Sequence, residues 1–242
     1  MILTSRQNPK IKYLKSLQQS KYRKQSQQFL INGYHIVEEA LKIPGIVQEI
    51  FEVEGFAKFP NSTLISNDLV PYLSEQKSPQ NIFALCNFKT NDQFKINKAI
   101  VLDNLQDPGN IGTIIRLAKA FDFDTIILNN VDIYNDKVIR SSQGALFSVN
   151  IFCTDNLELL LNNLKQKKGF LIYQTLLSKN AKKINDVQFR QNNIAFVFGN
   201  EGNGISQNIQ KLSDCDLYIP INFESLNVAC ACAIVLNKVF NG

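Results

Sequence analysis

A glycine-rich loop with a single carboxylate is the first feature of the chain that could do chemistry. It lies in Ile194–Ser206, where an apolar run leads into Gly199, Glu201, Gly202 and Gly204. An apolar run bounded by glycine is typical of a buried strand that ends in a loop. Glycines let a backbone approach a ligand closely and offer it amide donors. The stretch therefore predicts either a ligand site or, on local grounds alone, a simple turn.

The spacing of these glycines argues against a dinucleotide site. A dinucleotide fingerprint needs G-x-G-x-x-G, whereas this loop has G-x-x-G-x-G and places Glu201 where it would repel a pyrophosphate. A dinucleotide-dependent enzyme is therefore disfavoured.

Polar residues also gather in two other loops that follow predicted strands. The stretch Asp103–Arg116 (DNLQDPGNIGTIIR) turns into a helix that carries Asn110 and Arg116. Ser225 and Asn227 lie at the expected start of the last helix. On local grounds these residues are turn formers, helix caps and a solvated arginine. Together they supply more polar groups than caps require, which favours one shared site.

The elements that must position these loops alternate between strand and helix. We expect strands at Ala99–Leu102, Thr125–Leu128, Val149–Cys153, Gly169–Thr175, Ile194–Phe198 and Leu217–Ile219. We expect helices at Ile111–Phe121, Leu157–Lys167, from about Ser206, and at Ser225–Phe240, and a helix start at Asp136–Ser142. This alternation predicts a mostly parallel sheet with helices on both faces. Because ligands in such sheets sit beyond the carboxyl ends of the strands, the three loops should meet at that edge.

The first ninety residues predict a smaller α/β unit. Its expected strands are Phe29–Ile31, Ile46–Val53, Ser62–Ile65 and Asn81–Cys86, and two of its expected helices are Tyr34–Lys42 and Asp68–Ser74. The segment Asn87–Lys98 is polar and has no clear period. We therefore predict a boundary there, with domains at residues 1–95 and 96–242.

The N-terminal end is strongly basic. From Met1 to Val37 the chain has seven Lys or Arg and no Asp or Glu. Ile11, Leu14 and Leu17 recur at helical spacing, which predicts a basic amphipathic helix followed by a short basic linker. The asymmetry favours a polyanionic partner, with a solvated basic surface as the plain alternative. The candidate contact residues are Arg6, Lys10, Lys12, Lys15, Lys21, Arg23 and Lys24.

The composition of the chain limits the classes of protein to which it can belong. The chain has 242 residues, of which 45% are hydrophobic, which is enough for two modest domains. Five cysteines without a C-x-x-C pair, and a single histidine, predict neither a disulfide framework nor a metal site. We find no signal-peptide pattern and no apolar segment of membrane-spanning length, so we expect a cytoplasmic protein without a membrane segment.

The three loops resemble the three motifs of the SpoU/TrmH family of RNA ribose 2'-O-methyltransferases, in the SPOUT superfamily. The motifs are N-x-G-x-x-x-R, F-G-N-E-G-x-G-(I/L)-S and I-P…E-S-L-N-V. The matching residues are Asn110, Gly112 and Arg116; residues 198–206; and Ile219, Pro220 and residues 224–228. The N-terminal segments TSRQNPKIK and FLINGYHIVEEAL resemble the substrate-binding domain of many members, an α/β fold akin to ribosomal RNA-binding proteins. The resemblance covers nearly the whole chain.

The resemblance implies an S-adenosylmethionine-dependent enzyme with a particular fold. Its C-terminal α/β domain would contain a deep trefoil knot, and two chains would form a homodimer whose active sites combine residues from both. Backbone groups of the loops would hold the cofactor at Gly199, Ile219 and Leu226, with Thr175 as a further candidate.

The resemblance also assigns catalytic roles. Arg116 would activate the 2'-hydroxyl, and Asn110, Glu201, Ser225 and Asn227 would position Arg116 and the ribose. A free guanidinium stays protonated at neutral pH, so a role as a literal base needs strong help. Bidentate contact with the adjacent phosphate, which orients the hydroxyl, is the more economical account.

The expected substrate is 23S ribosomal RNA, because the N-terminal domain is commoner in family members that act on large-subunit ribosomal RNA. A transfer RNA methyltransferase is one alternative, and a non-catalytic RNA-binding or ribosome-assembly factor with this fold is another. Two departures stand out. Only Ile221, Asn222 and Phe223 separate Pro220 from Glu224, where the family commonly has a longer loop with glycine. Asp122 also replaces a usual glycine.

Overall fold

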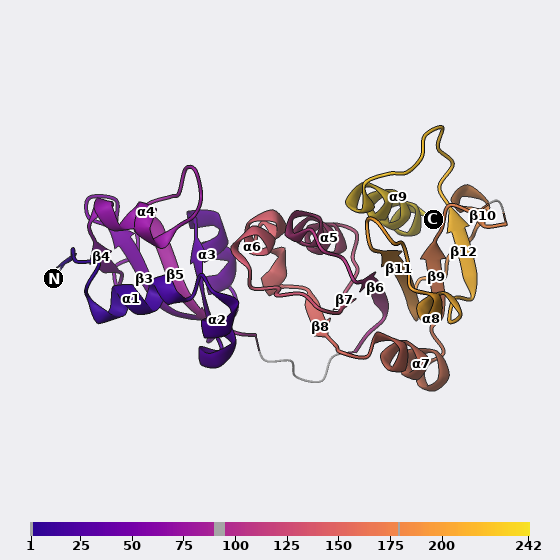
Figure 1. Ribbon diagram of the computed structural model, residues 1–242, viewed down its shortest axis with the longest axis horizontal. Coiled ribbons are helices and arrows are strands. Elements are labelled where there is room, and N and C mark those ends of the chain that lie inside the picture. Colours follow the sequence, from indigo (N-terminus) through magenta and orange to yellow (C-terminus); the bar gives the residue numbers. More distant parts are fainter. Residues whose placement is uncertain (1, 90–94, 179) are drawn as a thin grey trace. The chain divides into compact units, whose positions relative to one another are not determined.

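The computed structural model describes residues 2–89, 95–178 and 180–242, and the chain divides into two compact units (Figure 1). The first unit comprises Met1–Thr90 with Asp132–Phe147, and the second comprises Asn91–Val131 with Ser148–Gly242. The polar segment at residues 87–98, where we expected the boundary, lies partly outside the described residues. The first unit thus takes in a short piece of the C-terminal half of the sequence.

The first unit contains a mixed five-stranded sheet. Its strand order is β1 (Ile2–Leu3), β4 (Thr63–Ile65), β3 (Val47–Val53), β5 (Ile82–Asn87) and β2 (Gln28–Asn32). The pairs β1–β4 and β3–β4 are parallel, and β5 runs antiparallel to both of its neighbours. The helices from its N-terminal part are α1 (Pro9–Ser16), α2 (Ser20–Ser26), α3 (Tyr34–Leu41), η1 (Asn67–Leu69) and α4 (Val70–Leu73).

The basic N-terminal segment folds into two helices. Ile11 and Leu14 of α1 are fully buried against strands β3 and β4, as the helical spacing predicts. The short basic linker expected next is instead helix α2. Its Arg23 side chain is buried and donates hydrogen bonds to the carbonyl oxygens of Leu17 and Gln18 at the end of α1. These bonds pin α2 to the preceding turn.

Residues 132–147 pack with the first unit through an ion pair and an aromatic cluster. This segment contains α6 (Asp136–Ser142) and the short helix η2 (Ala145–Phe147). Arg23 Nη2 donates to Asp132 Oδ2 at 2.5 Å. The Tyr134 ring lies 4.4 Å from the ring of Phe29 and 4.0 Å from that of Phe88, measured between centroids.

The second unit is built on a seven-stranded sheet in which every neighbouring pair is parallel. Its order is β10 (Lys182–Lys183), β12 (Cys215–Tyr218), β9 (Leu171–Thr175), β11 (Ile194–Gly199), β6 (Lys98–Asp103), β7 (Thr125–Leu128) and β8 (Asn150–Cys153). Its helices are α5 (Pro108–Ala120), α7 (Leu157–Lys168), η3 (Ile184–Asp186), α8 (Gln207–Gln210) and α9 (Val228–Asn241).

Helices cover both faces of this sheet. Residues of α7 and α8 join Val101 of β6 and Val197 of β11 in one buried core, while α5 and α9 pack together on the opposite face (Figure 1). The strand residues are buried on both sides, which explains their continuous apolar runs. A parallel α/β domain together with a small N-terminal α/β domain confirms the expected fold class.

The carboxyl ends of the central strands stop at one level of the sheet. Gly199, the last residue of β11, pairs with Asp103, the last residue of β6, and Thr175 of β9 pairs with Leu217 of β12. The loops that follow these strands therefore leave from one edge.

The last helix begins later than we expected. It starts at Val228 rather than Ser225, because the Asn227 side chain accepts hydrogen bonds from the amides of Ala229 and Cys230 and caps the helix. Ser225 is left in the preceding loop.

Within residues 2–89, 95–178 and 180–242, no helix is long and apolar enough to cross a membrane. Over the same residues, no group of His, Cys, Asp and Glu side chains is arranged to hold a metal ion.

The Arg23–Asp132 pair gives the first testable prediction. Arg23→Ala would leave the partly buried Asp132 without its cation and two carbonyl oxygens without donors. Breaking a buried pair on one side costs about 3–5 kcal/mol, so the free energy of unfolding in a urea titration should fall by about that amount. Lys24→Ala, which changes an exposed neighbour, should stay within about 0.5 kcal/mol of the wild type.

The same pair predicts a pH dependence. Partial burial raises the pKa of the Asp132 carboxyl, but the hydrogen bond and charge of Arg23, with hydrogen bonds from Ser20 and the Tyr134 amide, outweigh it and hold the pKa below its ordinary value. A carboxyl with a lowered folded-state pKa contributes stability above its ordinary value of about 3.9 and loses it as pH falls through the folded-state pKa. The stability gap between wild type and Arg23→Ala should shrink over that acidic range. A gap unchanged on acidification would contradict the assignment.

Candidate active site

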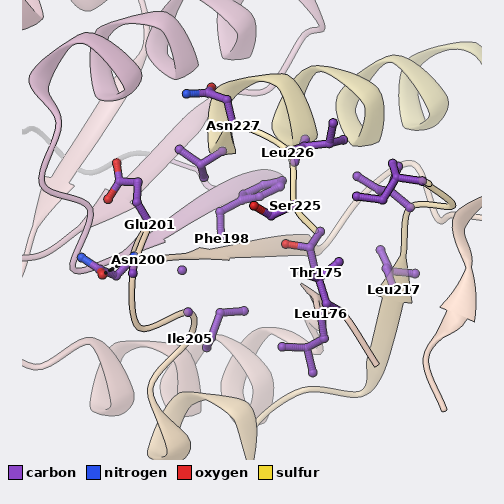
Figure 2. A pocket seen from close by; sticks show the side chains of 18 residues that line it. Thr175, Leu176, Phe198, Asn200, Glu201, Ile205, Leu217, Ser225, Leu226 and Asn227 are labelled. Atoms are coloured by element: carbon purple, nitrogen blue, oxygen red, sulfur yellow. Dashed lines mark hydrogen bonds between the residues drawn. The ribbon is translucent and has the colours of Figure 1, made fainter. Parts of the chain in front are cut away.

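A cavity of about 560 Å³ lies at the carboxyl ends of β9, β11 and β12 (Figure 2). Three segments that are far apart in the sequence form its wall. The lining residues are Thr175, Leu176 and Leu177; Phe198–Glu201, Gly202, Gly204 and Ile205; and Leu217, Ile219, Ile221, Ser225, Leu226, Asn227, Val228 and Ala231. All four residues proposed for the cofactor, namely Thr175, Gly199, Ile219 and Leu226, are among them.

The glycine-rich loop is a tight hairpin whose two arms touch. Asn200 and Gly204 exchange backbone hydrogen bonds of 3.0 and 2.9 Å. A Cβ atom at Gly199 would lie 2.2 Å from the carbonyl carbon of Gly204 and 2.4 Å from the amide nitrogen of Ile205. Gly204 has a φ of +68°, in the left-handed region that favours glycine. Two of the three glycines are therefore required by the shape of the loop.

The Asn200 side chain stiffens this hairpin from within. Its Oδ1 accepts hydrogen bonds from the amides of Gly202 and Asn203, at 2.9 and 3.0 Å. Its Nδ2 donates to the carbonyl oxygen of Asn104, in the loop after β6, at 2.8 Å. Glu201 is thus carried at the tip of a hairpin with a fixed backbone.

Asp103 anchors the far end of the same loop. Its carboxylate is buried, and Oδ2 accepts hydrogen bonds of 2.7 Å from both the amide and the hydroxyl of Ser206. Our sequence reasoning did not assign Asp103, Asn104 or Asn200 to the site. The available signal was a carboxylate placed directly at a strand end and followed by asparagine.

A chain of side-chain hydrogen bonds joins the three loops. Asn110 Nδ2 donates to Glu201 Oε1, and Asn227 Nδ2 donates to Asn110 Oδ1, each at 3.0 Å. Helix α5 places Asn110 in its first turn, where Asp107 caps the helix by accepting from the Asn110 amide. Asn227 is itself the cap of α9. Two helix starts and one hairpin thus meet at one edge of the cavity.

Glu201 is held as a carboxylate. Partial burial raises its pKa, but the hydrogen bonds from the Asn110 side chain and from backbone amides outweigh burial and leave the pKa below the ordinary value. Its hydrogen-bond partners are neutral, so the negative charge is available to a cation or to a donor hydroxyl.

Arg116 lies apart from this network. It is exposed on α5, does not line the cavity, and makes no hydrogen bond or ion pair with another residue in the described part of this chain. Ser225, by contrast, lines the cavity beside Leu226 (Figure 2). The structure therefore brings Asn110, Glu201, Ser225 and Asn227 together within one chain and leaves Arg116 outside.

The basic N-terminal residues have unequal surroundings. Arg6 and Lys15 lie over the Tyr72 ring, with Arg6 Cζ and Lys15 Nζ at 5.2 and 5.1 Å from its centroid. Lys10 pairs with Glu49. Lys12, Lys21 and Lys24 are exposed. Arg23 is buried and engaged by protein groups, as described above, so its guanidinium is not presented at the surface.

Comparison with known proteins assigns both parts of the chain. Residues 97–237 match the SpoU rRNA Methylase family, and residues 8–84 match the MRM3-like substrate binding domain. The chain is 36% identical over 245 residues to the 23S rRNA (guanosine(2553)-2'-O)-methyltransferase RlmP of Bacillus subtilis (strain 168), and the alignment covers 97% of each protein.

Solved structures agree with this assignment. An RNA 2'-O ribose methyltransferase is 25% identical with a TM-score of 0.85, covering 100% of this chain and 98% of the other. The SpoU methyltransferase AviRb from Streptomyces viridochromogenes, solved in complex with the cofactor AdoMet, has a TM-score of 0.85 at 22% identity and covers 97% and 98%. The second likeness concerns the fold alone.

The contact at Gly199 gives a prediction with an internal control. Gly199→Ala would force the hairpin open, because the new methyl group meets backbone atoms that cannot rotate away. Such overpacking costs about 1–3 kcal/mol, so the Kd for S-adenosylmethionine measured by calorimetry should rise about 5- to 150-fold. At Gly202 the nearest atom to an added Cβ is Asn200 Oδ1 at 3.6 Å, so Gly202→Ala should bind nearly as the wild type does. Equal effects at both positions would contradict this account of the loop.

Proposed function

The chain belongs to the SpoU rRNA methylase family, and from that premise we propose that it methylates a ribose 2'-hydroxyl of 23S ribosomal RNA with S-adenosylmethionine as methyl donor. The observation that carries this proposal is the convergence of Asn110, Glu201 and Asn227 beside a cavity lined by the four candidate cofactor residues. The similarity to a 23S rRNA 2'-O-methyltransferase over 97% of the chain supports the choice of substrate.

The cavity fits the proposed cofactor in size and chemistry. Its volume of about 560 Å³ is typical of small-molecule sites, which span about 300–1,000 Å³. Leu176, Leu217 and Leu226 offer apolar surface for a base, and the backbone at Gly199 and Ile219 offers hydrogen-bonding groups. When bound, S-adenosylmethionine supplies an electrophilic methyl group on a sulfonium centre.

The hydrogen-bonded side chains would orient the ribose and its activating residue. Glu201 can accept a hydrogen bond from a hydroxyl or pair with a guanidinium, while Asn110 fixes its direction. Arg116 would act by binding the adjacent phosphate and directing the 2'-hydroxyl rather than as a free base. Ser225 and Asn227 would complete the polar edge.

We further propose that the protein works as a homodimer in which each site receives Arg116 from the partner chain. Two observations support this. Arg116 is exposed and lies outside the cavity of its own chain. Helix α9, which packs against α5, leaves the large apolar side chains of Ile234 and Phe240 exposed. An apolar surface beside an unused catalytic arginine fits an interface between copies.

We place this activity in the cytoplasm. A ribosomal RNA substrate favours that compartment, and the five cysteines of the described structure are all free thiols, as is usual in reducing surroundings.

The principal test is to map 2'-O-methyl groups in RNA from a deletion strain and its parent. We expect one ribose methylation to disappear from 23S ribosomal RNA and to return when purified protein and S-adenosylmethionine are added to RNA from the deletion strain. Loss from transfer RNA instead would favour a transfer RNA enzyme. Cofactor binding with no methylation missing from any RNA would indicate a non-catalytic factor.

A mixed-subunit experiment tests the role of Arg116. Arg116→Ala should keep the wild-type Kd for S-adenosylmethionine and lose methyl transfer by on the order of a hundredfold or more, as when a group that acts on the reacting atoms is removed. At an S-adenosylmethionine concentration near the wild-type Kd, Gly199→Ala should transfer little methyl because its own cavity binds the cofactor weakly. Co-expressed together, the two variants should recover part of the activity, since mixed dimers contain one intact cavity facing one intact arginine. Mixtures that stay inactive, or a protein that is monomeric by light scattering, would overturn the proposal.

A further inference from the structure

The first unit (residues 1–90 and 132–147) contains the matched substrate-binding domain, and we call it the substrate-binding unit. It has two adjoining cavities outside the site described above. Their volumes are about 290 and 360 Å³, and they adjoin because Asn32 and Arg140 line both. One extends toward Ser74 and Asn135, and the other toward His35 and Ser78. We call the pair the amide groove, because Asn32, Gln76, Gln80, Asn135 and Gln143 all line it.

The fold builds this groove from three segments. Asn32, at the end of β2, donates through Nδ2 to the carbonyl oxygens of Gln80 and Ile82 and accepts from the Gln80 amide, which fixes the floor. Gln80 Oε1 in turn accepts from the amide of Tyr34 at the start of α3. Helix α6 closes the other side, where Gln76 Nε2 donates to Asp136.

Several polar atoms of the groove have no partner among the residues that the structure describes. Across the described residues, no hydrogen bond is made by the hydroxyls of Ser78 and Ser141 or by the Oε1 atoms of Gln76 and Gln143. Arg140 pairs with Asp136 through Nε, and its two terminal nitrogens make no bond to any other described residue. The groove therefore presents amides, hydroxyls and one guanidinium face to a ligand.

These groups match the edges and faces of unpaired nucleobases better than they match a duplex backbone. Amide and hydroxyl groups read base edges by donating and accepting together, and a guanidinium plane stacks on a base. Duplex RNA is instead recognised mainly through phosphates and 2'-hydroxyls, which calls for a row of cations. Here Glu75 and Asp136 offset part of the charge of Arg140 and Lys137, so the lining is mixed rather than strongly basic.

We propose that the amide groove binds single-stranded RNA nucleotides that flank the methylated position, with Arg140 stacking between the two cavities. The size agrees, because each cavity lies near the lower end of small-molecule sites and suits one nucleotide rather than a helix. This inference rests on the proposed function, since it assigns part of the RNA recognition to this unit. The groove would contact the bases of the RNA, in addition to the contacts that the cations of α1 and α2 would make.

Two variants with matched controls test the proposal. Arg140→Gln removes the guanidinium, and Ser78→Trp fills the groove from an exposed position. Lys42→Gln and Asn61→Trp make comparable changes at exposed sites elsewhere in the unit. With the full-length protein and a protein-free 23S rRNA transcript, the first two should raise the Kd and the KM for RNA about 5- to 150-fold, the scale of one lost stacking contact. The controls should leave both unchanged.

Further measurements separate this proposal from its alternatives. The Kd for S-adenosylmethionine and kcat at saturating RNA should match the wild type, and a short single-stranded oligonucleotide should compete at the groove where a blunt RNA duplex does not. Competition by the duplex alone, or unchanged RNA binding in both variants, would overturn it. Occupation of the groove by a ribosomal protein, and not by RNA, would also overturn the proposal.

A photo-crosslinking amino acid at position 78 guards against variants that fold poorly. It should attach to an unpaired nucleotide near the methylated ribose, and attachment to a helical stem, or to none, would count against the groove. If the wild type itself transfers no methyl group, the proposed function fails. If the wild type transfers methyl groups but the groove variants bind RNA as well as the wild type does, this inference alone fails.

Discussion

The contact between Gly199 and the backbone of Gly204 and Ile205 is the constraint on which the active site depends. The hairpin can close only because no Cβ stands between its arms. Closure sets the tip that carries Glu201 and leaves the wall of the cavity open to a ligand. Buried Asp103 holds the far end through Ser206, and Asn200 ties the near end to Asn104. The loop is thus pre-formed, so little ordering cost remains when a ligand binds.

The site separates its charges in a way that explains its chemistry. A carboxylate is kept ionised by neutral amides, while Arg116, the cation proposed for catalysis, is exposed on α5 within this chain. Had Arg116 already paired with Glu201 in the same chain, that pair would need to break before a phosphate could be gripped. Neutral partners avoid this competition, because they direct the carboxylate without cancelling its charge.

The substrate-binding unit combines structural and recognition roles in neighbouring residues. Arg23 belongs to the basic N-terminal stretch, yet its guanidinium is bonded to two carbonyl oxygens and to Asp132. The ion pair with Asp132 helps to attach residues 132–147 to the unit. This segment supplies Arg140 to the amide groove. Since this segment connects β7 and β8 of the other unit, the chain interleaves the RNA-binding and catalytic parts. Charge counting alone would have missed this division of labour.

Local sequence patterns were sufficient for the elements and for the identity of the motif residues. The apolar run of Thr125–Leu128 predicted a strand at its observed bounds, because continuous burial on both faces of a parallel sheet leaves such a run. A helix start was expected at Asp136–Ser142, where α6 lies. The carboxyl-end rule for parallel sheets also predicted that the three loops would converge. The resemblance then supplied the family and its reaction.

Only the tertiary structure decided which polar groups meet. The bonds of Asn110 to Glu201, of Asp103 to Ser206 and of Asn227 to Asn110 span 91, 103 and 117 positions of sequence. The tertiary structure alone also decided that Arg23 is buried, that Arg116 is exposed and that the amide groove forms. A residue's type records what it can bond to, but its partner depends on how distant segments pack, and no local period carries that information.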